Sequence, residues 1–360
     1  MTTTRKLASI QKIAEIKPIE NADNIEAVRV NGWWVVAKKD EFSINDLVVY
    51  FEIDSWIPNE LAPFLSKGKE PRVFEGVKGE RLRTVKLRGQ ISQGLILPIS
   101  SVFPNDANDY DFITFSEGIN LTDILGIKKW EAPIPAQLQG LMKGNFPSFI
   151  RKTDQERCQN LPEIFDDLDS EYELSVKLDG SSMTVYIKDG EIGICSRNLD
   201  LKVSEDNLEN TFIKVAHEQG LIDSLKEYHE MTGGRNIAIQ GELMGPGIQG
   251  NRENLKKHQF FLFDIWDIDS QEYFYKELKD SFISAFKVTS VPTIPNIGTH
   301  MESVASLREL NCTKLEDILA FVDKVKSLNH KIAEGVVFKR LDGKFSFKCI
   351  SNKFLLKERD

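Results

Sequence analysis

The sequence predicts an α+β protein with two domains: a small N-terminal β-barrel, then a mixed α/β domain with central antiparallel sheets. Three observations support this fold class. Short β-rich runs with little helical periodicity fill the first 125 residues or so, a polar segment with Pro133 and Pro135 follows, and longer apolar strands then alternate with helical patterns. A chain of 360 residues is long enough for two domains of ordinary size. We therefore expect domains at residues 1–130 and 131–360.

Turn and strand signals indicate the type of the first domain. Asn31-Gly32 stands between two β-rich runs, which is a strong signal for a two-residue hairpin. Residues 47–53 form another β-rich run, and residues 81–89 alternate basic and apolar side chains as one more strand. Short strands of this kind favour a small OB-like barrel, a fold that binds nucleic acids.

The second domain mixes strands and helices. Residues 173–180 form a strand that runs into a glycine turn, and Asp189-Gly190 predicts a hairpin. Residues 236–243 and 259–267 are nearly continuous apolar runs, as the central strands of a buried sheet require. Further along the chain, Thr313 with Glu316 predicts a capping box at the start of an amphipathic helix.

Charge is distributed unevenly along the chain. The net charge is −9, yet the segment from Lys67 to Arg88 contains eight basic and three acidic residues, a local balance of +5. A basic stripe on an acidic protein can bind phosphates, whereas a solvated charged face is the alternative interpretation. The candidate nucleic-acid-binding residues in this stripe are Arg81, Arg83, Lys86 and Arg88.

Other features narrow the class of protein. No stretch approaches the run of about 20 apolar residues that a membrane span needs, and the N-terminus lacks the apolar segment of a secretory signal. The four cysteines and five histidines show neither Cys-x-x-Cys nor His-x-x-x-His spacing, which argues against disulfides and a structural zinc site. We expect a monomer without membrane contact, located in the cytoplasm or nucleus.

The sequence KLDGSS, from Lys177 to Ser182, is the sharpest chemical feature. A lysine at the end of a buried strand, followed by Asp179 and Gly180, can present its amine into a cleft. Lysine is the basic side chain whose pKa shifts most readily on burial, so Lys177 is a candidate nucleophile. Taken alone, the short pattern is also typical of an exposed lysine at a turn.

Further short motifs follow in order: CSRN with Arg197, GELMGPGIQG with Glu242, FFLFDI with Phe263, AEGVVFK with Glu334, and FSFKCISNKF with Lys348. Together with KLDG, this set resembles the covalent nucleotidyltransferase superfamily of ligases and RNA-capping enzymes. The resemblance covers about 175 residues. GELMGPGIQG and AEGVVFK are especially similar to the motifs of the RNA-ligase branch.

The resemblance implies a role for each residue. Lys177 would carry AMP, Arg197 and Glu242 would contact the nucleotide, and Phe263 would stack on adenine. Glu334 would hold a divalent ion, Mg²⁺ or Mn²⁺, through bound water. Because phosphoryl transfer demands neutralisation of the α-phosphate of ATP, Lys348 and also Lys339 would supply cations. The remaining residues expected around the ATP are Val176, Asp179 and Ser182.

One position departs from the family pattern. Polynucleotide ligases often carry a second lysine two residues after Lys348, where this chain has Ile350. Lys353 is near in sequence, but its three-residue offset would not place it on the same face of a strand as Lys348. Whether Lys353 takes the missing role stays open.

The order of the domains indicates which ligases the chain is similar to. The sequence ends at Asp360, 12 residues after Lys348, and the β-domain comes first. This order resembles a clade of ATP-dependent RNA ligases with an N-terminal OB-like module and no C-terminal OB domain. Segments 146–162 and 88–95 also resemble that clade.

The resemblance implies sealing of 3′-OH/5′-phosphate breaks, such as nicks in RNA-containing duplexes, through a lysyl-AMP at Lys177 and an AMP-capped 5′ end. Two alternatives are a capping enzyme that transfers GMP and a non-catalytic RNA-binding protein on a ligase fold. The complete series of motif residues argues against the second alternative, and labelling with ATP or GTP separates the first.

Overall fold

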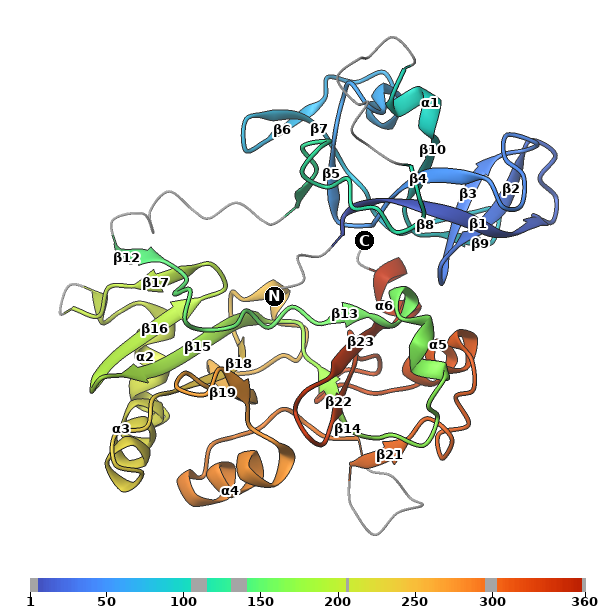
Figure 1. Ribbon diagram of the computed structural model, residues 1–360. Coiled ribbons are helices and arrows are strands. Elements are labelled where there is room, and N and C mark those ends of the chain that lie inside the picture. The colour runs from blue at the N-terminus through green and yellow to red at the C-terminus, as the bar shows by residue number, and fades with distance from the viewer. Residues whose placement is uncertain (1–5, 105–114, 131–140, 205–206, 295–302, 358–360) are drawn as a thin grey trace. The chain divides into compact units, whose positions relative to one another are not determined.

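The computed structural model describes residues 6–104, 115–130, 141–204, 207–294 and 303–357 (Figure 1). Contacts divide the chain into two compact units. The first contains Met1–Pro133 together with Gln159–Pro162, and the second contains Ile134–Cys158 and Glu163–Glu358. The predicted boundary between residues 130 and 131 adjoins residues 131–140, which lie outside the described residues, so its position stays a prediction.

The N-terminal unit is built almost entirely of antiparallel strands. One sheet has the order β10-β4-β1-β2-β3, a second has the order β11-β5-β7-β6, and β8 pairs with β9. Apolar side chains of β1 and β4, such as Ile10, Val49 and Phe51, are buried in one core. The elements are β1 (Ala8–Pro18), β2 (Ile25–Val30), β3 (Trp33–Lys38), β4 (Leu47–Phe51), β5 (Ser55–Pro58), η1 (Pro63–Ser66), β6 (Arg72–Phe74), β7 (Val77–Arg81), β8 (Val85–Leu87), β9 (Gln90–Ser92), β10 (Leu95–Pro98), α1 (Ile99–Val102) and β11 (Lys128–Lys129).

The long strand β1 curls the first sheet into a barrel. Its first half pairs with β4 and its second half with β2, and the register shifts between Ile13 and Glu15. A bulge of this kind bends a strand and increases its twist. On the far edge of the sheet, the backbone N–H of Gln93 donates to the carbonyl of Trp34 at 2.8 Å. The predicted small β-barrel is therefore confirmed.

Of two turns in this unit, the sequence predicted the one at Asn31-Gly32 but not the one at Arg88-Gly89. Asn31-Gly32 joins β2 to β3, and Asn31 has a φ of 48°. The single strand predicted over residues 81–89 is wrong, because β7 ends at Arg81 and β8 and β9 form a separate hairpin. The hairpin turns at Arg88-Gly89, where φ is 47° and 84°. Arginine rarely adopts this left-handed conformation, so the turn resembled a continuing strand.

The C-terminal unit contains two mainly antiparallel sheets. A seven-stranded sheet has the order β12-β17-β16-β15-β18-β19-β20, and a five-stranded sheet has the order β13-β23-β22-β14-β21, with only β13 parallel to its neighbour. Their strands are β12 (Met142–Asn145), β13 (Glu156–Arg157), β14 (Glu171–Lys177), β15 (Ser181–Lys188), β16 (Glu191–Ser196), β17 (Leu199–Leu201), β18 (Ile237–Met244), β19 (Gln259–Asp267), β20 (Glu272–Tyr273), β21 (Val304–Ser306), β22 (Gly335–Arg340) and β23 (Ser346–Ile350).

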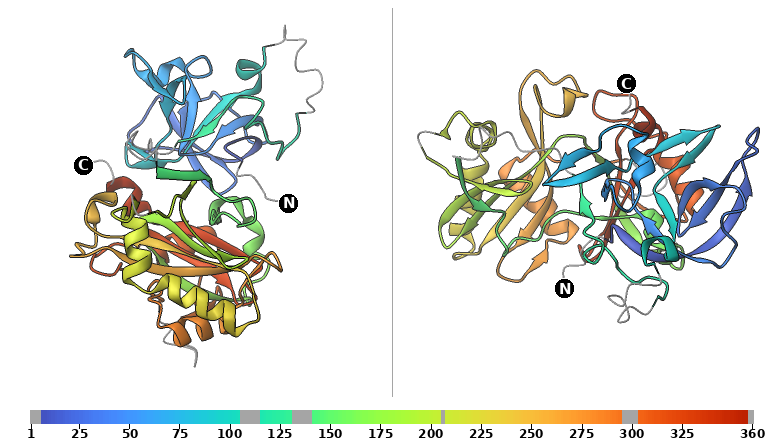
Figure 2. Two further views of the ribbon diagram at one scale, coloured as in Figure 1. Left: turned by 90° about the vertical axis from the view of Figure 1, so that its left-hand side faces the viewer. Right: turned by 90° about the horizontal axis from the view of Figure 1, so that it is seen from above.

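Helices cover one face of the seven-stranded sheet (Figures 1 and 2). They are α2 (Thr211–Glu218), α3 (Leu221–Met231) and α4 (Lys276–Phe286). Their apolar side chains, including Ile213, Leu225 and Phe282, share a buried cluster with Val185 and Ile239 of the sheet. The predicted central strands correspond to β18 and β19, so the predicted α+β fold with central antiparallel sheets is confirmed.

Two further helices are α5 (Leu315–Val322) and α6 (Asn352–Lys357), and 3₁₀ turns lie at Cys158–Asn160, Pro162–Phe165 and Gln249–Asn251 (η7). The predicted helix is therefore present as α5, and the capping box of Thr313 with Glu316 stays a prediction. The backbone N–H and the hydroxyl of Thr313 both donate to the carboxylate of Asp317 at 3.1 Å. In the described part of the chain, no helix is long and apolar enough to cross a membrane.

Candidate active site

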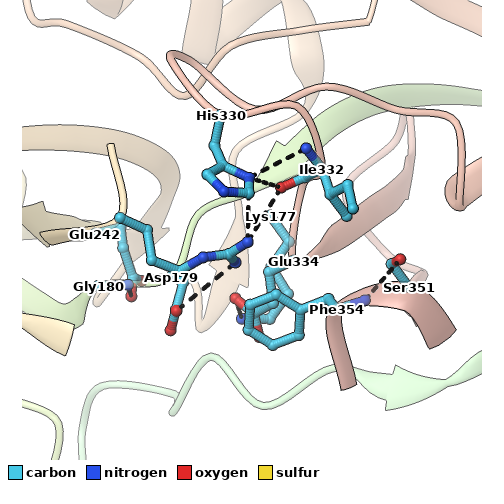
Figure 3. A network of polar contacts seen from close by, with 10 residues as sticks. Lys177, Asp179, Gly180, Glu242, His330, Ile332, Glu334, Ser351 and Phe354 are labelled. Atoms are coloured by element: carbon cyan, nitrogen blue, oxygen red, sulfur yellow. Dashed lines mark hydrogen bonds and ion pairs between the residues drawn. The ribbon is translucent and has the colours of Figure 1, made fainter. Parts of the chain in front are cut away.

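The two sheets of the C-terminal unit bring three of the predicted residues together. Lys177 is the last residue of β14, and its Nζ lies 2.7 Å from Oε2 of Glu334, which directly precedes β22 (Figure 3). Glu242 comes from β18 in the other sheet, and its Oε1 accepts the backbone N–H of Gly180 at 3.0 Å. A lysine and two carboxylates from distant parts of the chain therefore form one cluster.

Gly180 allows this close approach of the two sheets. An added Cβ at this position would lie 2.4 Å from the sulfur of Met244 and 2.5 Å from the carbonyl oxygen of Leu243. No side chain fits at such distances without moving backbone atoms. The glycine of the Lys-x-Asp-Gly motif thus has two functions here: it leaves room for β18, and its N–H holds Glu242.

The electrostatics of the cluster favour a charged lysine. Burial alone would lower the pKa of Lys177, but the carboxylates of Glu334 and Glu242 outweigh it, so the pKa of Lys177 is raised. Burial raises the pKa of Glu242 to about 7, an effect that Lys177 partly offsets and Glu334 adds to. In this state Lys177 is an ammonium ion, and it must lose a proton before it can act as a nucleophile.

Lys348 lies on the same face of the five-stranded sheet as Lys177. It is opposite Val337 of β22, and Val337 is opposite Ser175 of β14. Directly paired residues point to the same face of a sheet, and so do residues two apart along one strand. The strand register therefore aligns Lys348 with Lys177, displaced by two residues.

Ile350 occupies the position where related ligases often have a second lysine. It is opposite Gly335, which is opposite Lys177, and it is only 3% exposed. Lys353 is not on this strand, because it belongs to helix α6. Its Nζ donates to the backbone carbonyl of Asp323 at 3.2 Å, so its side chain caps the end of α5.

The residues expected to surround the nucleotide base and ribose are distributed over both sheets. Val176 and Phe263 belong to one apolar cluster, in which Phe263 is partly exposed. Ser182 is opposite Glu242 in the pairing of β15 with β18. Arg197 lies at the surface, with its Nη2 3.1 Å from Oδ1 of Asp154. The contacts of these residues with ATP stay predictions.

Lys339 belongs to a buried ionic network instead of the Lys177 cluster. It lies on β22 opposite Glu173, four residues along β14 from Lys177. Its ammonium forms an ion pair with Asp264, which directly follows Phe263. A second buried pair joins Glu173 to Lys279 of α4. Burial lowers the pKa of Lys339 to about 8, although Glu173 opposes the change. The role of Lys339 at the α-phosphate stays a prediction.

Arg252 is a residue of the site that no sequence motif indicated. It follows η7 in the loop after β18, and its Nη1 lies 4.0 Å from Oδ2 of Asp179. The same guanidinium contacts His330 and the carbonyl of Ile332, both close in sequence to Glu334. No spacing rule marks this arginine, because its partners are distant in sequence.

Part of the basic stripe in the N-terminal unit is neutralised within the protein. Arg81 forms an ion pair with Asp54 at 2.6 Å, and its guanidinium carbon lies 4.1 Å from the ring centre of Trp130. Other ion pairs in the stripe join Arg72 to Glu80 and Lys78 to Glu70.

The remaining predicted cations of the stripe are exposed. Arg83, Lys86 and Arg88 all have exposed side chains, and Lys86 and Arg88 belong to the β8–β9 hairpin. These three residues, rather than Arg81, are therefore the accessible candidates for binding phosphates.

Comparisons with known proteins agree with both units. A family model described as an OB-fold domain matches residues 7–99, and a model described as RNA ligase matches residues 170–352. Solved structures of a Naegleria gruberi RNA ligase are similar along nearly the whole chain. A variant without ligand has 44% identity and a TM-score of 0.84, covering 99% of this chain and 98% of that chain.

Two further structures of that ligase contain ligands. The complex with pyrophosphate has 44% identity and a TM-score of 0.84, with 99% of each chain covered. A variant with AMP and manganese has 44% identity and a TM-score of 0.81, with 98% of each chain covered. Other variants were solved with ATP and manganese. No curated protein sequence matched the chain.

An OB-fold domain followed by a domain with a lysine–carboxylate cluster defines a two-domain polynucleotide ligase. The chain belongs to the RNA ligase family. The predicted enzyme class, an ATP-dependent RNA ligase, is confirmed.

Proposed function

We propose that this ligase seals 3′-OH/5′-phosphate breaks, in particular nicks in RNA-containing duplexes, with ATP as the source of AMP and Lys177 as the nucleophile. The 2.7 Å contact of Lys177 with Glu334, next to Glu242, carries the proposal. It places the amine of a strand-end lysine among carboxylates that can accept its proton. The related Naegleria gruberi ligase, solved with ATP, with AMP and with pyrophosphate, supports ATP as the substrate.

The first step forms a bond between Nζ of Lys177 and the α-phosphorus of ATP, while the bond from that phosphorus to pyrophosphate breaks. Nζ must first lose a proton, and Glu334, whose Oε2 lies 2.7 Å away, and Glu242, which also raises the pKa of this amine, are carboxylates that can accept it. AMP then passes to the 5′-phosphate of the RNA, and the 3′-hydroxyl finally displaces AMP. Lys348, on the same face of the sheet as Lys177, would stabilise negative charge on the phosphate.

The residues present fit a divalent ion that is shared with the substrate. Among the described residues there is no group of three or more His, Cys, Asp or Glu that could hold a metal by itself. Mg²⁺ and Mn²⁺ prefer oxygen ligands, and Mg²⁺ is commonly bound through one or two carboxylates, several waters and substrate phosphates. Glu334 would hold such an ion, which would supply charge neutralisation at the α-phosphate.

The N-terminal unit would bind the duplex. An A-form helix is recognised mainly through its shape, phosphates and 2′-hydroxyls. The exposed Arg83, Lys86 and Arg88 suit phosphate contacts of this kind. These residues belong to an OB-fold domain, which would bind the RNA while the C-terminal unit carries out the reaction.

Transfer of label from [α-³²P]ATP to the protein tests the nucleophile. Wild type should become labelled with ATP but not with GTP, whereas Lys177→Met should take up no label while retaining its circular dichroism spectrum. Full labelling of Lys177→Met would assign the nucleophile to another residue.

Sealing of matched nicked duplexes tests the substrate. The duplexes carry RNA or DNA on each side of the nick and are assayed with ATP and either Mg²⁺ or Mn²⁺. We expect sealing to require RNA on the 3′-OH side. Equal sealing of nicks that are DNA on both sides would contradict this substrate class.

A further inference from the structure

Arg252 links three segments that meet at the candidate active site. It follows η7 (Gln249–Asn251) in the loop after β18, and its side chain is 23% exposed. Figure 3 shows its partners Asp179, His330, Ile332 and Phe354 around the Lys177–Glu334 pair. None of the sequence motifs assigns a role to this arginine.

Both terminal nitrogens of the guanidinium have protein partners. Nη1 lies 4.0 Å from Oδ2 of Asp179, two residues after Lys177. Nη2 lies 3.3 Å from Nδ1 of His330 and 3.4 Å from the carbonyl oxygen of Ile332. The guanidinium carbon is 4.5 Å from the ring centre of Phe354 in α6. A guanidinium held in this way is suited to fixing the segments around it rather than to binding a ligand.

The next residue, Glu253, holds the same segment from a second point. Its carboxylate, which is buried, accepts the backbone N–H of Asn329 at 2.6 Å. The side-chain amide of Asn329 donates back to the carbonyl of Glu253 at 2.9 Å. Arg252 and Glu253 therefore anchor residues 329–332, and Glu334 follows two residues later.

From these contacts we propose that Arg252 is a positioning residue for lysine adenylation. It holds Asp179 on one side and the segment 329–332 on the other, which keeps the carboxylate of Glu334 against Nζ of Lys177. The proposal rests on the proposed function, because it concerns the same adenylation step. Arg252 acts through these neighbours.

Single-turnover adenylation over a range of ATP concentrations tests the proposal. Arg252→Met keeps an unbranched apolar chain beside Phe354 but removes the charge and all contacts of the two terminal nitrogens. Loss of correct placement should lower the rate constant at saturating ATP by roughly 10- to 100-fold. The ATP concentration giving half-maximal rate should change little. Arg252→Lys should recover part of the rate, because lysine restores the charge beside Asp179 without the planar fork.

Arg308 offers a matched control in the same unit. It forms an exposed ion pair with Asp169, with Nε 2.6 Å from Oδ1, and it is remote in sequence from every motif residue. Arg308→Ala should adenylate like wild type. Thermal unfolding of each variant shows whether it is folded. If Arg252→Met is unfolded, the rate constant of Arg252→Lys at saturating ATP is compared with that of wild type instead.

Two results would overturn the proposal. In the first, Arg252→Met adenylates at the wild-type rate. In the second, only the ATP concentration for half-maximal rate rises, which would make Arg252 a nucleotide-binding residue. Failure of wild type itself to become labelled by ATP would instead refute the proposed function, so the two failures are distinguishable.

Discussion

Replacing Glu242 with glutamine should change how the stability of the protein depends on pH. Burial raises the pKa of Glu242 from its ordinary value of 4.5 to about 7 in the folded protein, whereas unfolding returns it to the ordinary value. Between these two values the folded state therefore holds a proton that the unfolded state releases. The stabilisation from this proton is complete below pH 4.5 and is lost as the pH rises through about 7.

The magnitude follows from the difference between the two pKa values. Because each unit of pKa difference is worth about 1.4 kcal/mol, the stabilisation from this proton is at most about 3 kcal/mol. Because Glu242 is partly exposed, solvent screening makes this an upper value. Glutamine keeps an oxygen that can accept the Gly180 N–H but does not titrate, so Glu242→Gln should lack this part of the pH dependence.

Urea unfolding of both proteins at several values between pH 5 and pH 8 measures the effect. The free energy of unfolding of Glu242→Gln, relative to wild type, should rise across this range. Comparing the two proteins at each pH cancels the contribution of every group that titrates identically in both. A difference that stays constant from pH 5 to pH 8 would refute the reasoning that burial raises this pKa.

Two further predictions concern charged groups outside the Lys177 cluster. Lys339→Met leaves the carboxylate of Asp264 buried without its ion pair, so the free energy of unfolding in urea should fall by about 3 kcal/mol. Adding Asp264→Leu should restore much of this loss. An unchanged free energy of unfolding for Lys339→Met alone would exclude a strong ion pair between Lys339 and Asp264. Arg83→Ala with Lys86→Ala should reduce the slope of log binding constant against log salt concentration by about 0.9 for each lost phosphate contact. Arg81→Ala should instead mainly destabilise the N-terminal unit through loss of its ion pair. An unchanged slope in the double variant would show that Arg83 and Lys86 belong to a solvated face.

Local signals predicted much of the fold, and they failed where a conformation was set by less usual residues. Asn31-Gly32 and Asp189-Gly190 gave hairpins because these residue types adopt left-handed conformations readily. Arg88 adopts the same conformation at its turn, and an arginine in an alternating segment gives no such warning. Asp317, one residue further along than the capping-box spacing suggests, accepts the backbone N–H of Thr313.

The candidate site was predictable where chemistry is carried by short motifs. Lys177, Glu242 and Glu334 are far apart in the chain, yet they were selected together and the structure brings them together. Arg252 could not be selected, because its contacts depend on how a loop of one sheet packs against segments of the other. The ion pair of Lys339 with Asp264 was hidden for the same reason.

The contact of Lys177 with Glu334 also bears on unwanted chemistry in the cell. An ammonium ion has no free electron pair, so it does not react with the thioesters, acyl phosphates and aldehydes that modify neutral lysine amines. The carboxylate 2.7 Å away raises the pKa of Lys177 and so lowers the fraction of its amine that is neutral. The ion pair that holds Nζ for adenylation should thus also slow acylation and glycation of the nucleophile between reaction cycles.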